Sequence, residues 1–337
     1  MPRSTPFWWA NRGPLAWPQL PFAVLFSLLS SARRFAWHIG LFHEQRLPVK
    51  VIVVGNVAVG GSGKTPVVIW LAEALRQQGW IPGIISRGYG GRAAVPTPVL
   101  PRSDPAEVGD EPVLISRRTG VPTWIGRDRP AVGRALLAAH PQVNVIISDD
   151  GLQHYRLARD VEIVVLDERI LGNILPLPAG PMREPLRRVR QSQLAILHGE
   201  SSARTRAAIG TVPTVGMALV PGRFYRLHEP SEQADAVQLK ALTLKALAGI
   251  GRPERFFESL RELGLEPRDT RAFPDHHVFS VRDLALDGAD ALLMTEKDAI
   301  KCRAIAPEQT WVLPVDAHID VAALDHILEC LNGPEAA

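Results

Sequence analysis

Cysteine is scarce in this sequence: the 337 residues include only Cys302 and Cys330. These two lie far apart, and neither belongs to a Cys-x-x-Cys pair or to a cluster of cysteine and histidine. The composition therefore argues against a disulfide framework and a structural zinc site. Such scarcity is typical of proteins that fold in a reducing cytosol.

Blocks of one charge sign are also missing. The 38 lysines and arginines nearly balance the 35 aspartates and glutamates, which leaves a formal net charge of +3. No run of basic residues of the type that binds nucleic acid is present, so we expect no nucleic-acid partner. The small positive surplus suits anionic small molecules or a lipid headgroup surface. No segment indicates a protein partner.

The sequence has no apolar run near its N-terminus that is long enough to cross a bilayer. The run from Leu20 to Ala32 ends at Arg33, whereas a spanning helix needs about 20 apolar residues. A signal peptide is the nearest alternative, but Ser31-Ala32-Arg33 is a poor cleavage site. Tryptophan and phenylalanine gather in residues 7–42 beside basic residues, so we interpret residues 1–45 as an amphipathic helix in the membrane interface. The alternative is that this helix packs on the core of its own protein.

Alternating strand and helix patterns are plentiful. They predict an α/β protein in which a P-loop domain with a parallel sheet spans residues 46–210. A β-ribbon linker is expected over 211–244, built from residues 215–220 and 223–227 with a turn at Pro221-Gly222. A smaller α/β domain is expected over 245–337, ending in a helix at 320–331. The Gly-, Pro- and Arg-rich stretch 87–112 reads as a loop.

A glycine-rich loop follows the apolar strand pattern at 49–54 and precedes a helix pattern. It reads Gly60-Gly61-Ser62-Gly63-Lys64-Thr65. Such a loop turns successive backbone N–H groups toward phosphate oxygens, while the lysine spans the β- and γ-phosphates and the threonine holds Mg²⁺. Position 58 is alanine where the general pattern has glycine, so we interpret this as a variant P-loop. The alternative is a glycine-rich turn without a ligand.

Asp149 and Asp150 end another apolar strand pattern. The carboxyl ends of parallel strands converge on the ligand crevice, where paired carboxylates suit Mg²⁺. Taken alone, Asp-Asp-Gly is a common turn. Together with the P-loop, it favours a metal site.

Several longer motifs are more specific than these local signals. The sequence resembles the tetraacyldisaccharide 4′-kinase family, which acts in lipid A synthesis of Gram-negative bacteria. The resemblance covers most of the chain. It rests on Gly55-Asn56, the P-loop with Pro66, Ser86-Arg87-Gly88-Tyr89-Gly90, Gly109-Asp110-Glu111-Pro112, Asp149-Asp150-Gly151-Leu152-Gln153-His154, Pro178-Ala179-Gly180-Pro181-Met182-Arg183-Glu184-Pro185, Phe273-Pro274-Asp275-His276-His277 and Thr295-Glu296-Lys297-Asp298.

The resemblance implies transfer of the γ-phosphate of ATP, with Mg²⁺, to the 4′-hydroxyl of a tetraacylated glucosamine disaccharide 1-phosphate. It also implies work at the cytoplasmic face of the bacterial inner membrane. Asp110 and His276 would form a catalytic dyad whose base stays unassigned, assisted by Lys64. Arg183 and Glu184 would lie near substrate and metal, and Gln153 and His154 near the phosphates. By itself, each of Asp110 and His276 is an ordinary loop residue, and Arg183 is equally well a solvated loop arginine.

Two other functions remain as alternatives. A P-loop GTPase would carry a switch aspartate where Ser148 stands relative to Gly151. It would also carry Asn-Lys-x-Asp, with which Glu296-Lys297-Asp298 is out of register. A peripheral membrane scaffold that merely binds nucleotide would need neither Asp110 nor His276.

Overall fold

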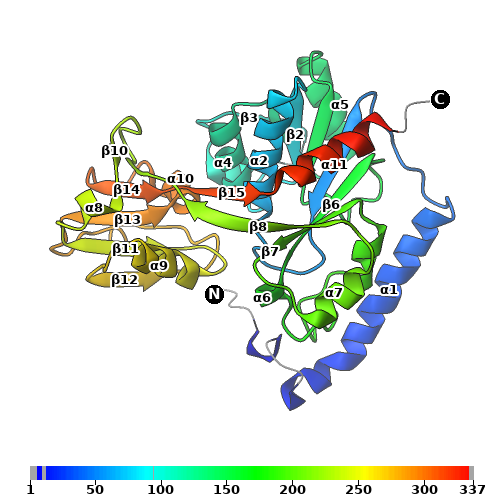
Figure 1. Cartoon of the computed structure of the whole chain (residues 1–337), viewed down its shortest axis with the longest axis horizontal. Helices are drawn as coiled ribbons and strands as arrows, with labels where there is room; N and C mark the ends of the chain where they lie inside the picture. The colour runs from blue at the N-terminus through cyan, green and yellow to red at the C-terminus, as the bar shows by residue number, and fades with distance from the viewer. Residues whose placement is uncertain (1–5, 10–12, 94, 334–337) are drawn as a thin grey trace.

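The computed structural model describes residues 6–9, 13–93 and 95–333. A nine-stranded sheet forms the centre of its larger unit, in the order β15-β8-β7-β6-β1-β5-β2-β4-β3 (Figure 1). The strands of this sheet are β1 (Lys50–Gly55), β2 (Pro82–Ser86), β3 (Thr97–Val99), β4 (Thr123–Ile125), β5 (Val145–Asp149), β6 (Val161–Asp167), β7 (Leu194–His198), β8 (Thr214–Pro221) and β15 (Val315–Ile319). Neighbouring strands pair in parallel, except that β3 and β15 run antiparallel at the two edges.

Helices cover both faces of this sheet, which is why its central strands are Val-, Ile- and Leu-rich throughout. On one face, Leu71 of α2 and Leu324 of α11 pack against Ile147 of β5 in a shared core. On the other face, Leu136 of α5 packs with Ile146. The helices of this unit are α2 (Lys64–Gln77), α3 (Pro105–Val108), α4 (Asp110–Thr119), α5 (Arg129–Ala139), α6 (Glu168–Leu171), α7 (Ala203–Ile209) and α11 (Val321–Asn332), with the 3₁₀ turn η3 (Leu186–Gln191).

A six-stranded sheet forms the smaller unit, in the order β10-β9-β14-β13-β11-β12. Phe256 and Leu260 of α9 pack in the core on one face, and Ala299 and Cys302 of α10 pack in the core on the other. The elements are β9 (Phe224–Arg226), β10 (Gln233–Ala234), α8 (Ala236–Leu239), β11 (Leu244–Ala248), α9 (Pro253–Glu262), β12 (Asp269–Ala272), β13 (Ala291–Thr295), α10 (Glu296–Cys302) and β14 (Thr310–Leu313).

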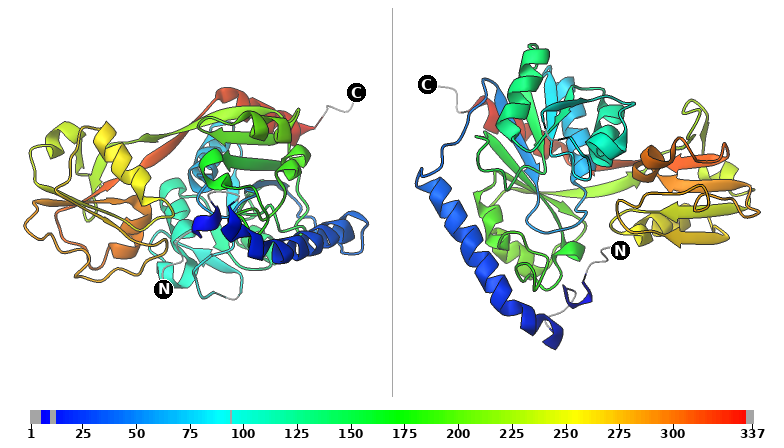
Figure 2. Two further views of the ribbon diagram at one scale, coloured as in Figure 1. Left: turned by 90° about the horizontal axis from the view of Figure 1, so that it is seen from below. Right: turned by 180° about the vertical axis from the view of Figure 1, so that it is seen from behind.

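The connection between the units differs from the predicted ribbon. Strand β8 pairs antiparallel with β15, not with the segment after Pro221, and the two strands run side by side between the units (Figures 1 and 2). The chain changes sheets at Gly222, whose N–H donates to the carbonyl of Pro314. Strand β9 then pairs with β14 and β10 of the smaller sheet. A ribbon is present, but its second strand comes from the far end of the chain, which local sequence patterns do not reveal.

Two other segments also differ from the sequence-based prediction. The C-terminal helix α11 packs on the larger sheet and is not part of the smaller unit. The reason is that β15, which precedes it, leads the chain from the smaller unit back to the larger sheet. The predicted loop over 87–112 contains β3 and α3, and α4 begins within it at Asp110. A helix N-terminus therefore fixes the backbone of that residue.

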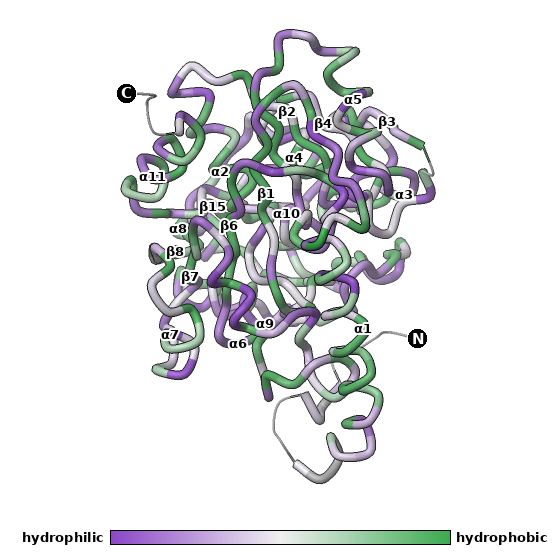
Figure 3. The backbone as a smooth tube through the Cα atoms, turned by 90° about the vertical axis from the view of Figure 1, so that its right-hand side faces the viewer, coloured by the Kyte–Doolittle hydropathy of each residue, from purple (hydrophilic) through white to green (hydrophobic). Residues whose placement is uncertain are grey.

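The N-terminal segment lies along the outside of the larger unit. It comprises η1 (Phe7–Trp9), η2 (Pro14–Gln19) and α1 (Leu20–His38), and Figure 3 shows apolar residues along much of the α1 tube. Only Ala23 of α1 is buried. Within the described residues, no helix combines the length and apolar character that crossing a membrane requires. The predicted start at residues 1–5 lies outside the described part.

Candidate active site

The P-loop connects β1 to α2. Gly60 and Gly63 have φ angles of +122° and +91°, a region that side chains rarely enter, so glycine is required at both positions. Asn56 shapes the loop from within, since its Nδ2 donates to the Gly60 carbonyl at 3.3 Å and to Ser62 Oγ at 3.2 Å. Ala58 is buried, forms a β-bridge with Met182 and is not among the residues with positive φ. Glycine is therefore not needed at position 58.

Lys64 is the first residue of α2, and its Nζ lies 3.5 Å from Asp150 Oδ1. Arg183 Nη1 donates to the same carboxylate at 3.1 Å. Burial opposes ionisation of Asp150, but Lys64 and Arg183 outweigh it and hold its pKa well below the usual range. The structure therefore brings three predicted site residues into one ion-paired cluster.

Asp149 occupies a different environment from its neighbour. It is buried and accepts a hydrogen bond from Ser86 Oγ at 2.9 Å. Burial raises its pKa to about 6, and the charges of Glu111 and Asp150 add to the effect. A divalent cation would stabilise the ionised form of Asp149 and lower its pKa. The carboxylates of Asp149 and Asp150 therefore fit Mg²⁺. Among the described residues, no three His, Cys, Asp or Glu side chains come close enough to hold a metal ion, so Asp149, Asp150 and Glu184 do not form a ready-made site.

Glu184, the third carboxylate predicted to bind metal, has other cationic neighbours than Asp149 and Asp150. Its Oε2 accepts from Arg34 Nη1 at 3.1 Å and from the Tyr155 hydroxyl at 2.8 Å. Arg188 Nε lies 3.5 Å away. All of these contacts are made by Oε2, whereas Oε1 is buried and has no hydrogen-bond partner among the described residues.

Gln153 and His154 also have clear surroundings. Gln153 Nε2 donates to the Asn56 carbonyl at 3.0 Å, so it supports the backbone just before the P-loop. Burial lowers the pKa of His154 to about 4, helped by Arg129 and Arg87, so its imidazole is neutral at pH 7. Of the predicted phosphate-binding residues in the described part, Arg183 lines the central cavity, whereas Gln153 and His154 do not.

Asp110 and His276 meet across the two units, as predicted for a dyad. His276 Nδ1 lies 3.1 Å from Asp110 Oδ2, and the Glu111 N–H donates to Asp110 Oδ1 at 2.9 Å. Burial would raise the pKa of Asp110, but the hydrogen bond with His276 and the charge of Lys297 lower it to about 2. The same hydrogen bond raises the pKa of His276. The contact therefore favours the ionised carboxylate and the protonated imidazole over their neutral forms.

Lys297, which was not among the predicted site residues, is also a member of this cluster. Its Nζ donates to Glu111 Oε1 at 3.1 Å and to Asp275 Oδ1 at 3.0 Å, and lies 3.9 Å from Asp110 Oδ2. Burial opposes its charge, yet the three carboxylates raise its pKa. The motif Thr295-Glu296-Lys297-Asp298 was the available signal. Its contacts depend on how the two sheets face each other.

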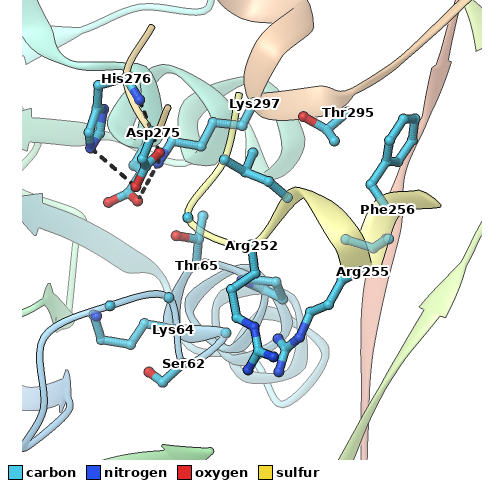
Figure 4. Close-up of a pocket in the computed structure, with 18 of the residues that line it drawn as sticks. Ser62, Lys64, Thr65, Arg252, Arg255, Phe256, Asp275, His276, Thr295 and Lys297 are labelled. Atoms are coloured by element: carbon cyan, nitrogen blue, oxygen red, sulfur yellow. Dashed lines mark hydrogen bonds and ion pairs between the residues drawn. The ribbon is translucent and has the colours of Figure 1, made fainter. Parts of the chain in front are cut away.

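A cavity of about 1460 Å³ separates the two units and contains these groups. The larger unit contributes the P-loop, Asp150 and Arg183. The smaller unit contributes His276 and Lys297, which Figure 4 shows in the same pocket as Lys64 and Thr65. Tyr89 also lines it, with its ring 5.4 Å from that of His276. A triphosphate on the P-loop would therefore face an acid–base pair across the cavity. Fold and site define the class of protein: a P-loop phosphotransferase with two α/β units.

Comparison with known proteins identifies the family. Residues 15–332 match the family model described as Tetraacyldisaccharide-1-P 4′-kinase. The chain is 49% identical over 330 residues to the tetraacyldisaccharide 4′-kinase of Azoarcus sp. (strain BH72), covering 98% of this chain and 96% of that one. It is 50% identical to that of Dechloromonas aromatica (strain RCB), covering 97% and 96%. The chain belongs to the tetraacyldisaccharide 4′-kinase family.

A solved structure agrees with this assignment. The crystal structure of "apo" form LpxK from Aquifex aeolicus in complex with ATP superposes with a TM-score of 0.81 at 29% identity, covering 94% of this chain and 99% of that one. The predicted family, α/β fold and kinase class are confirmed. These findings exclude the GTPase and scaffold alternatives.

Proposed function

We propose that this kinase transfers the γ-phosphate of ATP to the 4′-hydroxyl of a tetraacylated glucosamine disaccharide 1-phosphate by means of the residues described above. The observation that carries this proposal is the Asp110–His276 pair, 3.1 Å apart, with His276 lining the same cavity as the P-loop. An alcohol that approached His276 would have its oxygen between an acid–base pair and a phosphate-binding loop. That arrangement suits in-line phosphoryl transfer.

Different residues of the chain bind the phosphates and accept the proton. Backbone amides of Gly60 to Gly63 and the Lys64 ammonium hold the phosphates. The Asp110–His276 pair accepts the proton of the attacking hydroxyl as a unit, since Asp110 is ionised and hydrogen bonded to the imidazole. Arg183 lines the cavity, so it is placed to contact phosphate oxygens.

Mg²⁺ would be held by the Thr65 hydroxyl with Asp149 and Asp150. When bound, it neutralises charge on the β- and γ-phosphates. The raised pKa of Asp149 supports this set, because a buried carboxylate without a cation is costly to ionise.

The membrane surface would be the second partner. Along α1, the side chains of Phe22, Leu25 and Leu28 are each more than half exposed to solvent. Such a continuous apolar stripe on a helix suits the lipid interface, where the acylated acceptor resides. We therefore assign the enzyme to the cytoplasmic face of the bacterial inner membrane, where ATP is available, with residues 1–45 as the attachment.

The decisive experiment is transfer of label from γ-labelled ATP to an acylated disaccharide 1-phosphate, compared with release to water. We expect label on the lipid, lost in Lys64→Ala and reduced about 10²- to 10⁴-fold in Asp110→Ala and His276→Ala. Full activity in folded Asp110 and His276 variants would refute the dyad. Label that goes only to water would refute the acceptor.

A further inference from the structure

One arginine of the N-terminal helix contacts the residue that follows Arg183. Arg34 Nη1 donates to Glu184 Oε2 at 3.1 Å, and its Nη2 donates to Ser31 Oγ of the same helix, also at 3.1 Å. The side chain of Arg34 is only 21% exposed. Most residues of α1, which lies along the outside of the larger unit (Figures 1 and 2), are exposed. Arg34 therefore reaches inward from a helix whose apolar side chains face solvent.

Glu184 depends on this arginine for much of its charge compensation. Its carboxylate is buried, and Oε2 also accepts from the Tyr155 hydroxyl at 2.8 Å. The other cation beside it is Arg188, whose Nε lies 3.5 Å away and whose Nη2 donates to both oxygens of Glu162 at 2.8 Å. Arg34 is thus the nearer cation of the two, and Arg188 is shared with a second acid. Without Arg34, a buried carboxylate would be left poorly compensated, so we expect it to shift.

The backbone of Glu184 is tied to the entrance of the P-loop. The N–H groups of Arg183 and Glu184 both donate to the Val57 carbonyl, at 2.8 and 3.2 Å. The Arg183 guanidinium in turn donates to Asp150 at 3.1 Å, and the same carboxylate lies 3.5 Å from Lys64 Nζ. A shift of the Glu184 side chain would therefore displace the backbone that carries Arg183 toward the phosphate site.

We propose that Arg34 is a positioning residue for phosphoryl transfer: it holds Glu184 and, through the adjoining backbone, keeps Arg183 in place beside Asp150. Helix α1 then has a second role besides attachment to lipid, because it supplies a side chain on which the geometry of the phosphate site depends. The inference rests on the proposed function in that Arg183 contacts phosphate oxygens during the transfer.

A purely structural role is the alternative, in which Arg34 only fastens α1 to the larger unit. Loss of Arg34 would then weaken the contact of the helix and leave kcat unchanged. The two bonds from the backbone of Arg183 and Glu184 to Val57 favour the positioning role, because they connect this segment with the P-loop itself.

The test uses the full chain with a detergent-dispersed acylated disaccharide 1-phosphate, so that attachment to a membrane does not limit the rate. We expect Arg34→Gln to lower kcat about ten- to a hundredfold, because a small displacement of a positioned group is costly. Arg34→Lys keeps a cation near Glu184, which receives a single bond and not a fork, and should stay within about threefold of the wild type. Arg46→Gln, at an exposed arginine that pairs with Asp160, is the matched control and should equal the wild type.

A second measurement separates positioning from fastening of the helix. If Arg34 acts through Arg183, the double variant Arg34→Gln/Arg183→Gln should be no slower than Arg183→Gln alone. Sedimentation of Arg34→Gln with phosphatidylethanolamine–phosphatidylglycerol vesicles should stay within about twofold of the wild type, because the apolar stripe of α1 is unchanged.

Circular dichroism and thermal melting identify variants that fail to fold. If Arg34→Gln is among them, Ser31→Ala replaces it, which removes only the acceptor of Arg34 Nη2 and should lower kcat about threefold. A kcat equal to that of the wild type in the folded variant would overturn the proposal, and so would independent losses that multiply in the double variant. Release of label only to water by the wild type would count against the proposed function alone, and the Arg34 comparison would then be made on that release.

Discussion

At the scale of single residues, the charge balance around Asp110 is the central feature. Asp110, Glu111 and Asp275 all lie within 4 Å of the Lys297 ammonium. His276 adds a hydrogen bond to Asp110. This hydrogen bond and the Lys297 charge hold the pKa of Asp110 below its ordinary value, although burial alone would raise it.

The protonation of His276 gives a prediction with a definite sign. Because Asp110 accepts its hydrogen bond, the pKa of His276 should lie above the ordinary 6.5 in the wild type. Asp110→Asn should lower it, since the variant loses the Asp110 charge while burial and Lys297 still oppose protonation and only Asp275 still favours it. NMR titration of labelled histidines measures this directly. An unchanged pKa in the variant would show that Asp110 does not tune the imidazole.

The same pair contributes to stability with a matching pH dependence. A raised His276 pKa stabilises the fold fully below pH 6.5, and this contribution is lost as the pH rises through the folded pKa. The lowered Asp110 pKa contributes above about 3.8 and is lost as the pH falls toward 2. Asp110→Asn should therefore cost stability mainly between these limits, as urea unfolding at several pH values would reveal.

Lys297 provides a second test at this scale. Replacing it with methionine keeps the side-chain length but leaves Glu111, Asp110 and Asp275 without a shared cation. The pKa of Asp110 should rise, and kcat should fall by about ten- to a hundredfold because the dyad is misplaced. Lys240→Met, at an exposed position, is the control. Unchanged kcat in Lys297→Met would limit this lysine to a structural role.

At the scale of elements, α1 stands apart from the other helices. Its polar anchors are few: Arg34 pairs with Glu184, and Arg33 Nη2 reaches the Gln153 carbonyl at 3.5 Å. Its apolar side chains face solvent instead of the core. Ala23 is the one residue of α1 that is buried, so the helix contributes little to the core of its own protein. The element is held at one end and leaves an apolar stripe unpartnered.

This arrangement predicts how the enzyme binds lipid. Combined Phe22→Ser, Leu25→Ser and Leu28→Ser should reduce sedimentation with phosphatidylethanolamine–phosphatidylglycerol vesicles by about a hundredfold or more, because each buried side chain of this type contributes about 1.5–3 kcal/mol. Binding of Mg-ATP should not change. Val237→Ser, an exposed apolar residue of α8, is the control. Variants that still sediment like the wild type would remove α1 as the attachment.

At the scale of the whole molecule, ion pairs join the two units beside the β8–β15 ribbon. Arg118 of α4 donates to Glu296 of α10 at 2.8 Å and to Asp316 of β15. Glu296 is buried, and burial raises its pKa despite the nearby guanidinium. The orientation of the smaller unit over the P-loop therefore depends partly on one arginine.

Removing that arginine should be costly. Arg118→Ala leaves Glu296 buried without its partner, so we expect a loss of about 3 kcal/mol in the free energy of unfolding. Arg92→Ala, which breaks the exposed pair with Glu107, should cost less than about 0.5 kcal/mol. Urea unfolding compares them. Equal stability of the two variants would mean that the contact between the units does not depend on Arg118.

The sequence alone was enough for the features that depend on short spacings. Glycines before Lys64, the two aspartates after a strand, and the motifs around Asp110 and His276 are local patterns, and so are most strands and helices. Their chemistry follows from backbone geometry that a few neighbouring residues dictate.

Only the tertiary structure decided what lies beside what. The pairing of β8 with β15, the return of α11 to the larger sheet, the place of Lys297 beside Asp110 and the approach of Gly251 to the P-loop all join residues distant in sequence. Such contacts depend on how two sheets face each other across a cavity. No local pattern encodes that geometry, because it results from packing over the whole chain.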